Sequence, residues 1–299
     1  MYKGKKIGVA IPAYNEEKNI GRVLSEIPEF VDRIYVVDDA STDSTAEVVK
    51  KFMKKDGRIV LISHKENQGV GGAIVSGWKK GIEEGMEIMA VMAGDAQMDP
   101  AYLPSLLDPI VENRADFSKG TRFWGDAWKS TPKIRIFGSF LLNVLNKIAS
   151  GYWHVNDPQN GYVAISAEAL RKLELDKLYK GYAFENDLLI RANVAGLRVV
   201  SVPVVIRYHE AASSKLKISK FALKTSWFLL KRFLWRIWKK YIVRGNPIGF
   251  AYLLGFILIL LGVIFVIFAN YLVLILGVIF FLIACFFEWK RGGIIDSNS

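Results

Sequence analysis

Carboxylate and amide side chains gather directly after a short apolar run. Residues 88–93 are apolar, and Asp95, Gln97 and Asp99 follow them, before Pro100. We expect the apolar run to be a buried strand and the polar residues to occupy the loop at its carboxyl end. Such hard oxygen ligands suit a divalent cation that bridges the two phosphates of a nucleotide. A polar loop that only caps the next helix is the alternative interpretation, and Asp99 followed by proline favours it.

An earlier polar loop also follows an apolar run. After residues 7–12 come Tyr14, Asn15 and Glu16. Their aromatic ring, amide and carboxylate suit a base and a ribose. A capped helix start is the alternative; it explains Asn15 and Glu16 but gives no reason for Tyr14.

The next apolar run ends in two adjacent carboxylates. The apolar run after that is followed by glycines. The charges of Asp38 and Asp39 repel each other, so such a pair usually has a cation, a ligand or backbone N–H groups to satisfy it. We predict that Asp39 contacts a nucleotide and that Asp43 is structural. Glycines in residues 69–72 would let a ligand approach the backbone before a helix, although they match neither a P-loop nor G-x-G-x-x-G.

The alternation of these runs indicates the fold class. Strand-like apolar runs and helical patterns alternate four times by residue 100. This order predicts an α/β fold with a parallel, doubly wound sheet whose polar loops share one edge.

Four segments occur in an order and spacing that resemble a known family. They are Pro-Ala-Tyr-Asn-Glu at 12–16, Val-Asp-Asp-Ala-Ser-Thr-Asp at 37–43, Asn-Gln-Gly-Val-Gly at 67–71 and Gly-Asp-Ala-Gln at 94–97. Over roughly residues 5–215 the chain resembles the inverting family 2 glycosyltransferases of GT-A fold, above all dolichol-phosphate mannose synthases and polyprenyl-phosphate glucosyltransferases. The resemblance implies a Rossmann-like, mostly parallel GT-A catalytic domain in residues 1–214.

The resemblance also implies roles for residues in these segments. Asp95 and Gln97 would hold Mg²⁺ or Mn²⁺ on the diphosphate, and Gly94 would contact the nucleotide sugar. The family usually begins this motif with an aspartate, where this chain has Ala93. The cation would then be held more weakly, or mainly by the two remaining side chains and the diphosphate. The nucleoside pocket would be lined by Pro12, Tyr14, Glu16, Val37 and Asp39.

Residues nearer the acceptor follow from the same resemblance. Arg122 resembles an arginine that reaches a phosphate, with an ordinary surface arginine as the alternative. Asp157 would orient the acceptor or the sugar. Glu185 and Asp187 would face the acceptor, unless they only complement the dipole of the helix that they open. A lipid phosphate is already ionised near neutral pH, whereas a sugar hydroxyl would need Asp157 or Asp187 as a base.

An acceptor loop that closes over the diphosphate is the last implied part of the site. Arg207 and Lys215 would contact the nucleotide sugar from it, and their spacing, about two residues longer than in related synthases, favours Lys215. The predicted catalytic residues are Asp95, Arg122, Asp157, Asp187 and Lys215, and Arg122 also belongs to the nucleotide-sugar set.

Charge is distributed unevenly along the chain. Of the net charge of +11, residues 211–299 contribute +10, because 12 Lys and Arg face only Glu288 and Asp296. This excess beside the most apolar part suits an anionic membrane surface better than nucleic acid. The single Cys285 allows no internal disulfide, and Glu16 comes too early for a signal peptide, so we expect the catalytic domain in the cytoplasm.

The C-terminal part predicts membrane attachment. Residues 215–246 combine basic and tryptophan residues and should form amphipathic helices in the headgroup region. Residues 248–287 carry no charge and are too long for one span. We therefore predict two transmembrane helices within 247–289, at about 248–268 and 272–287, with both termini and the tail 290–299 cytoplasmic. Small residues would let the spans of different protomers pack: Gly249, Gly255, Gly262 and Gly277.

Three functions are compatible with these features. The first is an enzyme that transfers one sugar, with inversion, from a donor such as GDP-mannose or UDP-glucose to a polyprenyl or dolichyl phosphate at the membrane. The second is a membrane polysaccharide synthase, although the Gln-x-x-Arg-Trp motif of that group is absent and two spans are few for a pore. The third is a non-catalytic nucleotide-sugar-binding membrane protein, which Ala93 makes conceivable.

Overall fold

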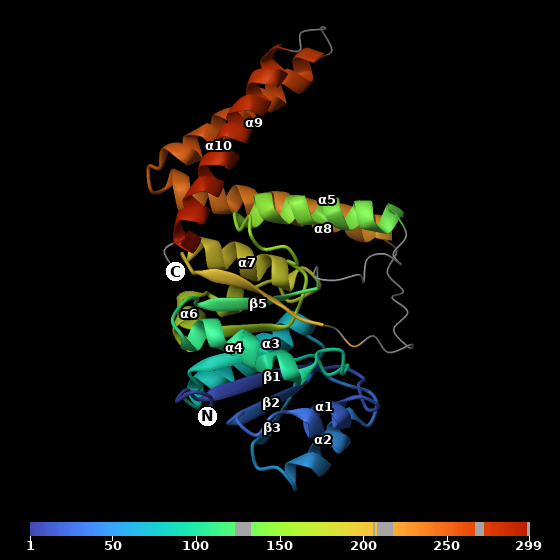
Figure 1. The fold of residues 1–299 in the computed structure, drawn as a ribbon. Coiled ribbons are helices and arrows are strands. Elements are labelled where there is room, and N and C mark those ends of the chain that lie inside the picture. Colours follow the sequence, from blue (N-terminus) through green and yellow to red (C-terminus); the bar gives the residue numbers. More distant parts are fainter. Residues whose placement is uncertain (123–132, 206, 208–217, 267–271, 298–299) are drawn as a thin grey trace.

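One sheet organises the molecule, and its strands agree with the predicted α/β class. The computed structural model describes residues 1–122, 133–205, 207, 218–266 and 272–297. The strand order in the sheet is β3-β2-β1-β4-β6-β5-β7 (Figure 1). β6 is antiparallel to β4 and β5, while the other neighbouring pairs are parallel, so the mostly parallel sheet is confirmed. The strands are β1 (Ile7–Ala13), β2 (Arg33–Asp38), β3 (Ile59–Ser63), β4 (Ile88–Val91), β5 (Phe117–Thr121), β6 (Val163–Ser166) and β7 (Val199–Pro203).

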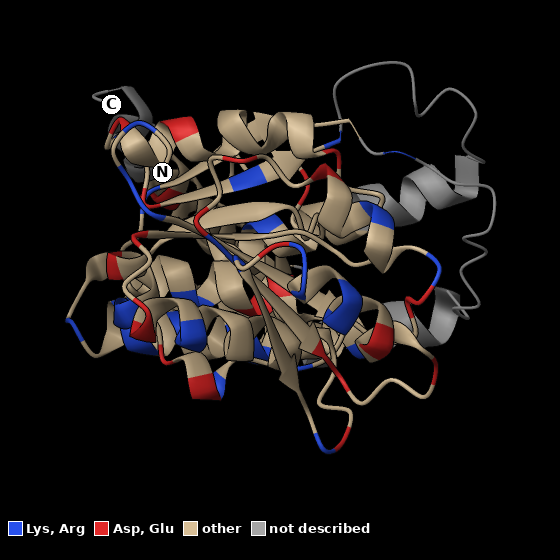
Figure 2. Cartoon of the chain, turned by 90° about the horizontal axis from the view of Figure 1, so that it is seen from below, with Lys and Arg blue, Asp and Glu red and all other residues tan. Residues whose placement is uncertain are grey.

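Helices cover both faces of the sheet. α1 (Ile20–Glu26), α2 (Thr45–Met53) and α4 (Leu103–Val111) share one apolar cluster, and α3 (Val70–Glu83), α6 (Ala167–Lys172) and α7 (Phe184–Val194) share the other. Short 3-10 turns are η1 (Pro100–Tyr102) and η3 (Leu175–Lys177). Acidic and basic residues mix over this α/β part (Figure 2), as its nearly balanced charge requires.

The middle of the sheet shows why these runs form strands. Val9 and Ile11 of β1 point into the first cluster, whereas Ala10 between them points into the second. All three are fully buried, as expected for a parallel strand covered on both faces. Gly77 of α3 lies so close to β1 that a side chain there would meet Ala10 Cβ at 2.8 Å.

A second layer of helices lies beyond α7. α5 (Lys133–Ser150) and α8 (Ile218–Ile237) run side by side over it (Figure 1), and π-helical η4 (Trp238–Ile242) continues α8. α9 (Pro247–Val266) and α10 (Leu272–Ser297) then project away from the α/β part. A third apolar cluster joins α7, α8, α9 and α10 through residues such as Ile190, Phe233, Tyr252 and Ala284.

The apolar helices α9 and α10 pack against each other through glycine. A side chain at Gly262 would meet Leu274 Cα at 2.4 Å, and one at Gly277 would meet Ile259 N at 2.6 Å. Gly255 likewise faces Phe281, while Gly249 faces Tyr241. These glycines, predicted to serve contacts between protomers, are therefore used within the chain, and association between protomers stays a prediction.

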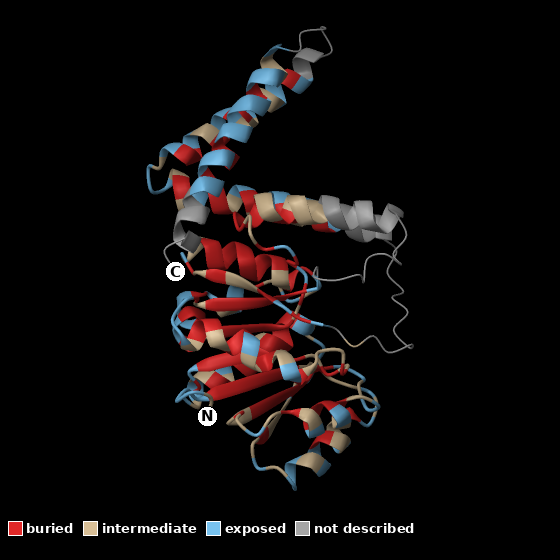
Figure 3. Ribbon diagram, viewed as in Figure 1, coloured by how far each residue is buried: buried red, intermediate tan, exposed pale blue. Residues whose placement is uncertain are grey.

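Within the residues that the structure describes, one helical segment is long and apolar enough to cross a membrane. This segment, Leu272–Lys290, has only 22% of its residues buried, unlike the core helix of a soluble protein. Pro247–Val263 is apolar but shorter, and exposed residues cover much of both helices (Figure 3). The predicted two-span hairpin thus stays a prediction, and residues 269–271, between the two expected spans, lie outside the described residues.

A buried ion pair attaches α10 to the rest of the chain. Arg236 of α8 is fully buried, pairs with Glu288 of α10, and also donates to the carbonyl oxygens of Ile148 and Ala149, both at 2.8 Å. The hydroxyl groups of Tyr241 and Tyr252 donate to the same carboxylate. Because every partner is satisfied, the network fixes where α10 meets the α/β part.

We expect Glu288→Ala to destabilise the protein by about 3–5 kcal/mol, because it leaves the Arg236 guanidinium buried without its carboxylate. Thermal melting of the full chain in detergent measures the effect. Glu168→Ala is the matched control, since Glu168 pairs with Lys172 at the surface and its loss should cost less than about 1 kcal/mol. Equal melting temperatures for the two variants would contradict the expectation.

Candidate functional site

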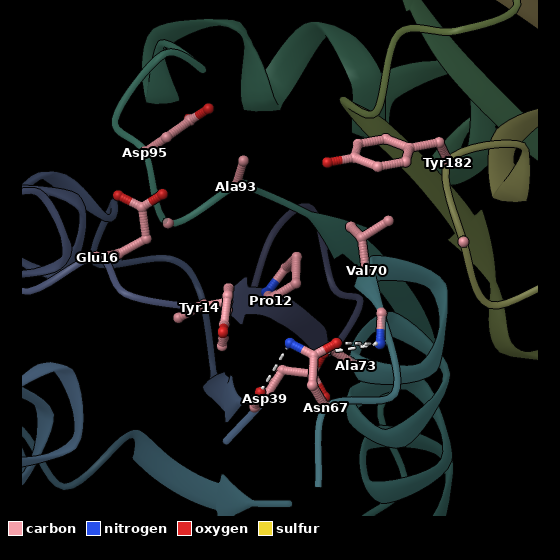
Figure 4. Close-up of a pocket in the computed structure, with 14 residues that line it drawn as sticks. Pro12, Tyr14, Glu16, Asp39, Asn67, Val70, Ala73, Ala93, Asp95 and Tyr182 are labelled. Carbon is pink, nitrogen blue, oxygen red and sulfur yellow. Dashed lines mark hydrogen bonds between the residues drawn. The ribbon is translucent and has the colours of Figure 1, made fainter. Parts of the chain in front are cut away.

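The loops after β1, β2, β3 and β4 enclose a pocket of about 550 Å³ at the carboxyl edge of the sheet. Register explains their meeting, because Pro12 pairs with Val37 and Ala13 with Asp38 in neighbouring strands. A pocket of this size can hold a nucleotide-sized ligand. Figure 4 shows its lining, which consists of Pro12, Ala13, Tyr14, Glu16, Asp39, Asn67, Gly69, Val70, Ala73, Ala93, Gly94, Asp95, Gly181 and Tyr182.

The structure brings together six of the predicted nucleotide-sugar residues at this pocket: Pro12, Tyr14, Glu16, Asp39, Gly94 and Asp95. Val37 is instead fully buried in β2, near Gly77 of α3. Gln97, Arg122 and Arg207 do not line the pocket, and Lys215 lies outside the described residues. The roles of all these residues stay predictions.

Three loops at the pocket hold a residue in the left-handed backbone region. They are Asn15 at φ 56°, Ala40 at φ 60° and Ala96 at φ 60°. Alanine rarely adopts this conformation, and such strain is concentrated at functional sites. Each residue lies next to a residue that lines the pocket, namely Tyr14, Asp39 or Asp95.

The adjacent carboxylates Asp38 and Asp39 are both satisfied by protein donors. Asp38 Oδ1 accepts from the Ser41 N–H at 3.1 Å. Asp39 accepts from His64 Nδ1 at 2.6 Å and from the N–H groups of Gln68 and Gly69 at 2.9 and 2.8 Å. Asp39 therefore anchors the glycine loop to the end of β2, and its carboxylate remains part of the pocket wall.

Asp43, predicted to be structural, ties neighbouring loops together. It accepts hydrogen bonds from the N–H groups of Thr45 at 3.0 Å and Glu17 at 3.2 Å. Burial opposes ionisation, but these bonds and that of the Thr45 hydroxyl lower the pKa of Asp43. The residue thus links the first two pocket loops without lining the pocket.

Negative charge gathers at one side of the pocket. Figure 4 shows Glu16 and Asp95 together there, and Asp95 Oδ1 also accepts from the Gln97 N–H at 3.0 Å. Burial raises the pKa of Glu16, as do the carboxylates of Asp95 and Asp43, while a hydrogen bond from Asn19 opposes them. Ala93 contributes only a methyl group to this region.

This donor set fits a magnesium-type cation that a diphosphate helps to hold. No group of three His, Cys, Asp or Glu residues suited to a metal occurs among the described residues. Mg²⁺ is, however, commonly bound by one or two carboxylates together with substrate phosphates. Asp95 and Glu16 can supply such oxygens, and the side-chain amide of Gln97 stays a predicted ligand, since the contacts of Gln97 with Asp95 and with the Arg207 N–H are made by its backbone.

Arg122 and Asp157 form a two-point ion pair beyond β5. Arg122 Nε lies 2.6 Å from Asp157 Oδ2 and Arg122 Nη2 lies 2.8 Å from Asp157 Oδ1, while the backbone N–H of Arg122 also donates to Oδ2. Asp157 is almost fully buried, whereas 39% of the Arg122 side chain is exposed. Asp157 is thus placed to orient the arginine fork.

A buried lysine lies beside this pair. Lys119 of β5 donates to the carbonyl oxygen of Asn160, and burial lowers the pKa of Lys119 to about 8, against the opposing charges of Glu185 and Asp157. Burial raises the pKa of Glu185, because in both residues it disfavours the charged form.

Asp187, predicted to be catalytic, lies in a structural network. It is fully buried and accepts from the Tyr179 N–H at 2.9 Å, from Arg191 Nε at 3.1 Å and from Arg232 Nη2 at 3.3 Å, and its other oxygen forms an ion pair with Arg232 Nε at 2.8 Å. These contacts join α7, the preceding loop and α8. Asp187 does not line the pocket.

Arg207 lies beside the loop that carries Asp95. It forms ion pairs with Glu26 at 2.5 Å and with Asp99 at 2.8 Å, and its N–H donates to the Gln97 carbonyl oxygen. Asp99 also caps η1 by accepting from the Ala101 N–H, as the alternative interpretation of this loop proposed.

His64 and Tyr182 are among the residues of the site that were missed from the sequence. His64 follows β3 and supports Asp39, and Tyr182 is largely exposed with its ring directed toward the pocket (Figure 4). The loop of Tyr182 is held at the glycine loop, since the Gly71 N–H donates to the Lys180 carbonyl oxygen at 2.9 Å and Lys180 Nζ to Gln68 Oε1 at 2.8 Å. No local pattern indicated either contact.

Comparison with known proteins independently supports the family resemblance drawn from the sequence. The family model described as glycosyl transferase family 2 matches residues 8–174. The UDP-N-acetylglucosamine–dolichyl-phosphate N-acetylglucosaminyltransferase of Methanococcus voltae is 30% identical over 225 residues, 71% of this chain and 89% of that one. The polyprenol monophosphomannose synthase of Mycolicibacterium smegmatis is 33% identical over 215 residues, 70% and 80% of the two chains.

A solved structure shares the fold. Glucosyl-3-phosphoglycerate synthase of Mycobacterium tuberculosis, crystallised with Mg²⁺ and uridine diphosphate, aligns with a TM-score of 0.56 and 22% identity, covering 78% of this chain and 79% of that one. At this identity the likeness concerns the fold alone.

Proposed function

Because the chain belongs to glycosyl transferase family 2, we propose that it transfers one sugar, with inversion, from a nucleotide-diphosphate sugar to a polyprenyl or dolichyl phosphate. The carboxyl-edge pocket is the observation that carries this proposal. Tyr14 and Asp39 line it and would contact the nucleoside, and Asp95 and Glu16 also line it and would offer carboxylates toward the diphosphate. Two relatives with about a third of their residues identical are named for transfer to lipid phosphates of this kind.

The chemistry needs charge stabilisation more than a base. An ionised lipid phosphate is itself a nucleophile, so its attack on the sugar carbon requires no proton removal. Asp95, with Glu16 beside it, would hold Mg²⁺ or Mn²⁺, which when bound offsets charge on the leaving diphosphate. Arg122, oriented by Asp157 through Nε and Nη2, would bring a guanidinium charge to a phosphate.

The acceptor requires a membrane, and the outer helices supply a suitable surface. Trp227, Leu234 and Trp238 of the α8–η4 segment are exposed, and Lys231 lies over the Trp227 ring. Exposed tryptophan beside lysine suits the headgroup region of an anionic leaflet. We propose that α8 lies there, that α9 and α10 both enter the bilayer, and that the catalytic domain and both termini are cytoplasmic.

The proposal is tested by incubating membranes that contain the protein with a panel of labelled UDP- and GDP-sugars, with and without EDTA. We expect label in a lipid fraction from which mild acid releases it, and loss of that label with EDTA. Label only in water-soluble polymer would indicate a polysaccharide synthase. Label that stays in the intact donor would indicate a non-catalytic binding protein.

A further inference from the structure

The acceptor capacity of Asp39 is restricted by its own neighbours. An ionised carboxylate has about four lone-pair positions. Oδ1 accepts from His64 Nδ1 and the Gln68 N–H, and Oδ2 accepts from the Gly69 N–H. Three of the four positions are therefore taken by described residues, and the remaining one belongs to Oδ2.

His64 keeps Oδ1 occupied. An ionised carboxylate only accepts, so His64 Nδ1 carries the shared hydrogen, and Nε2 on the other side of the ring lies 2.9 Å from the Ser76 hydroxyl. The His64 side chain is buried between the end of β3 and α3. Oδ1 cannot turn toward a ligand without losing two hydrogen bonds.

Asn67 places a donor beside this acceptor. Its Nδ2 donates one hydrogen to the Asp39 carbonyl oxygen at 3.2 Å and carries a second hydrogen. Asn67 and Asp39 both line the pocket and lie next to each other in Figure 4. The pocket wall here offers one acceptor position and an adjacent donor.

This pattern matches uracil better than guanine. Uracil presents one N–H, at N3, between two carbonyl oxygens, so it needs one acceptor flanked by donors. Guanine presents two parallel N–H groups, at N1 and N2, and pairs best with both oxygens of a free carboxylate. Resting on the proposed function, we propose that the site selects uridine nucleotides over guanosine nucleotides, with Asp39 accepting the uracil N3–H and His64 acting as a positioning residue.

Calorimetric titration of the full chain in detergent with Mg²⁺ tests this selection. The probes are UDP, GDP and 3-methyl-UDP, which lacks the N3–H. We expect UDP to bind at least about tenfold more tightly than GDP, and the methyl group to weaken binding about ten- to a hundredfold, as for a hydrogen bond to a charged group. GDP binding as tight as UDP, or equal binding of UDP and 3-methyl-UDP, would overturn the inference.

Variants of Asp39 and His64 test the roles of these two residues separately. Asp39→Ala should bind UDP and 3-methyl-UDP equally; if it does not fold, the wild-type comparison still decides. His64→Ala should reduce the ratio between the two affinities, and His64→Asn, which retains a donor, should restore part of it. An unchanged ratio in His64→Ala would refute the positioning role.

Transfer from a GDP-sugar to lipid phosphate would defeat this inference alone, whereas absence of any lipid product would defeat the proposed function.

Discussion

Asp95→Ala is expected to reduce sugar transfer by about two to three orders of magnitude. The variant removes a carboxylate that lines the pocket and that we propose to serve the diphosphate, and Ala93 supplies no second carboxylate from the same loop. Loss of one group that stabilises developing charge typically has this effect on turnover. Initial rates of lipid-linked product, measured over a range of Mg²⁺ concentrations, give the magnitude.

Two further variants sharpen this test. Asp176→Ala is the matched control, because Asp176 pairs with Lys79 on an exposed surface away from the pocket. Ala93→Asp should lower the Mg²⁺ concentration needed for half-maximal nucleotide binding, because it adds a carboxylate to the pocket. Full EDTA-sensitive activity in Asp95→Ala would show that the cation is held elsewhere.

Arg122→Ala should lower turnover by about a hundredfold, and Asp157→Ala should do nearly the same. The first variant removes the guanidinium that we propose to contact phosphate, and the second removes the two side-chain hydrogen bonds by which Asp157 orients it. Arg122→Lys should rescue little, because lysine cannot make the two-point contact. Single-turnover rates of the purified protein measure these effects.

The double variant distinguishes orientation from base catalysis. If Asp157 acts through Arg122, the Arg122→Ala/Asp157→Ala enzyme should be about as slow as either single variant. The pH profile of Asp157→Asn should keep its wild-type shape at a lower rate. Multiplied losses in the double variant, or disappearance of the acidic limb in Asp157→Asn, would instead identify Asp157 as a base.

The sheet and most of the pocket were predictable because they depend on local patterns. Each of the first four apolar runs became a strand, and polar residues that follow all four met at one edge: Tyr14 after β1, Asp39 after β2, Asn67 after β3 and Asp95 just beyond β4. Parallel strands bring such loops together whatever lies between them.

Residues whose roles depend on distant partners were harder to interpret. Asp187 has the position of an acid at a helix start, but its burial and its bond to Arg232 of α8 appear only in the folded chain. Tyr182 reaches the pocket through a loop more than a hundred residues from the glycine loop that holds it. Gly255, Gly262 and Gly277 showed that backbones approach closely, but the sequence alone did not identify their partner as the neighbouring helix.

The central claim is that a lipid phosphate is the acceptor, and its most direct test compares acceptors. Purified protein in lipid nanodiscs receives a labelled donor together with either a polyprenyl phosphate or the corresponding polyprenol. We predict mild-acid-labile lipid product with the phosphate and none with the alcohol. Equal transfer to both lipids, or no lipid product with any donor, would contradict the account.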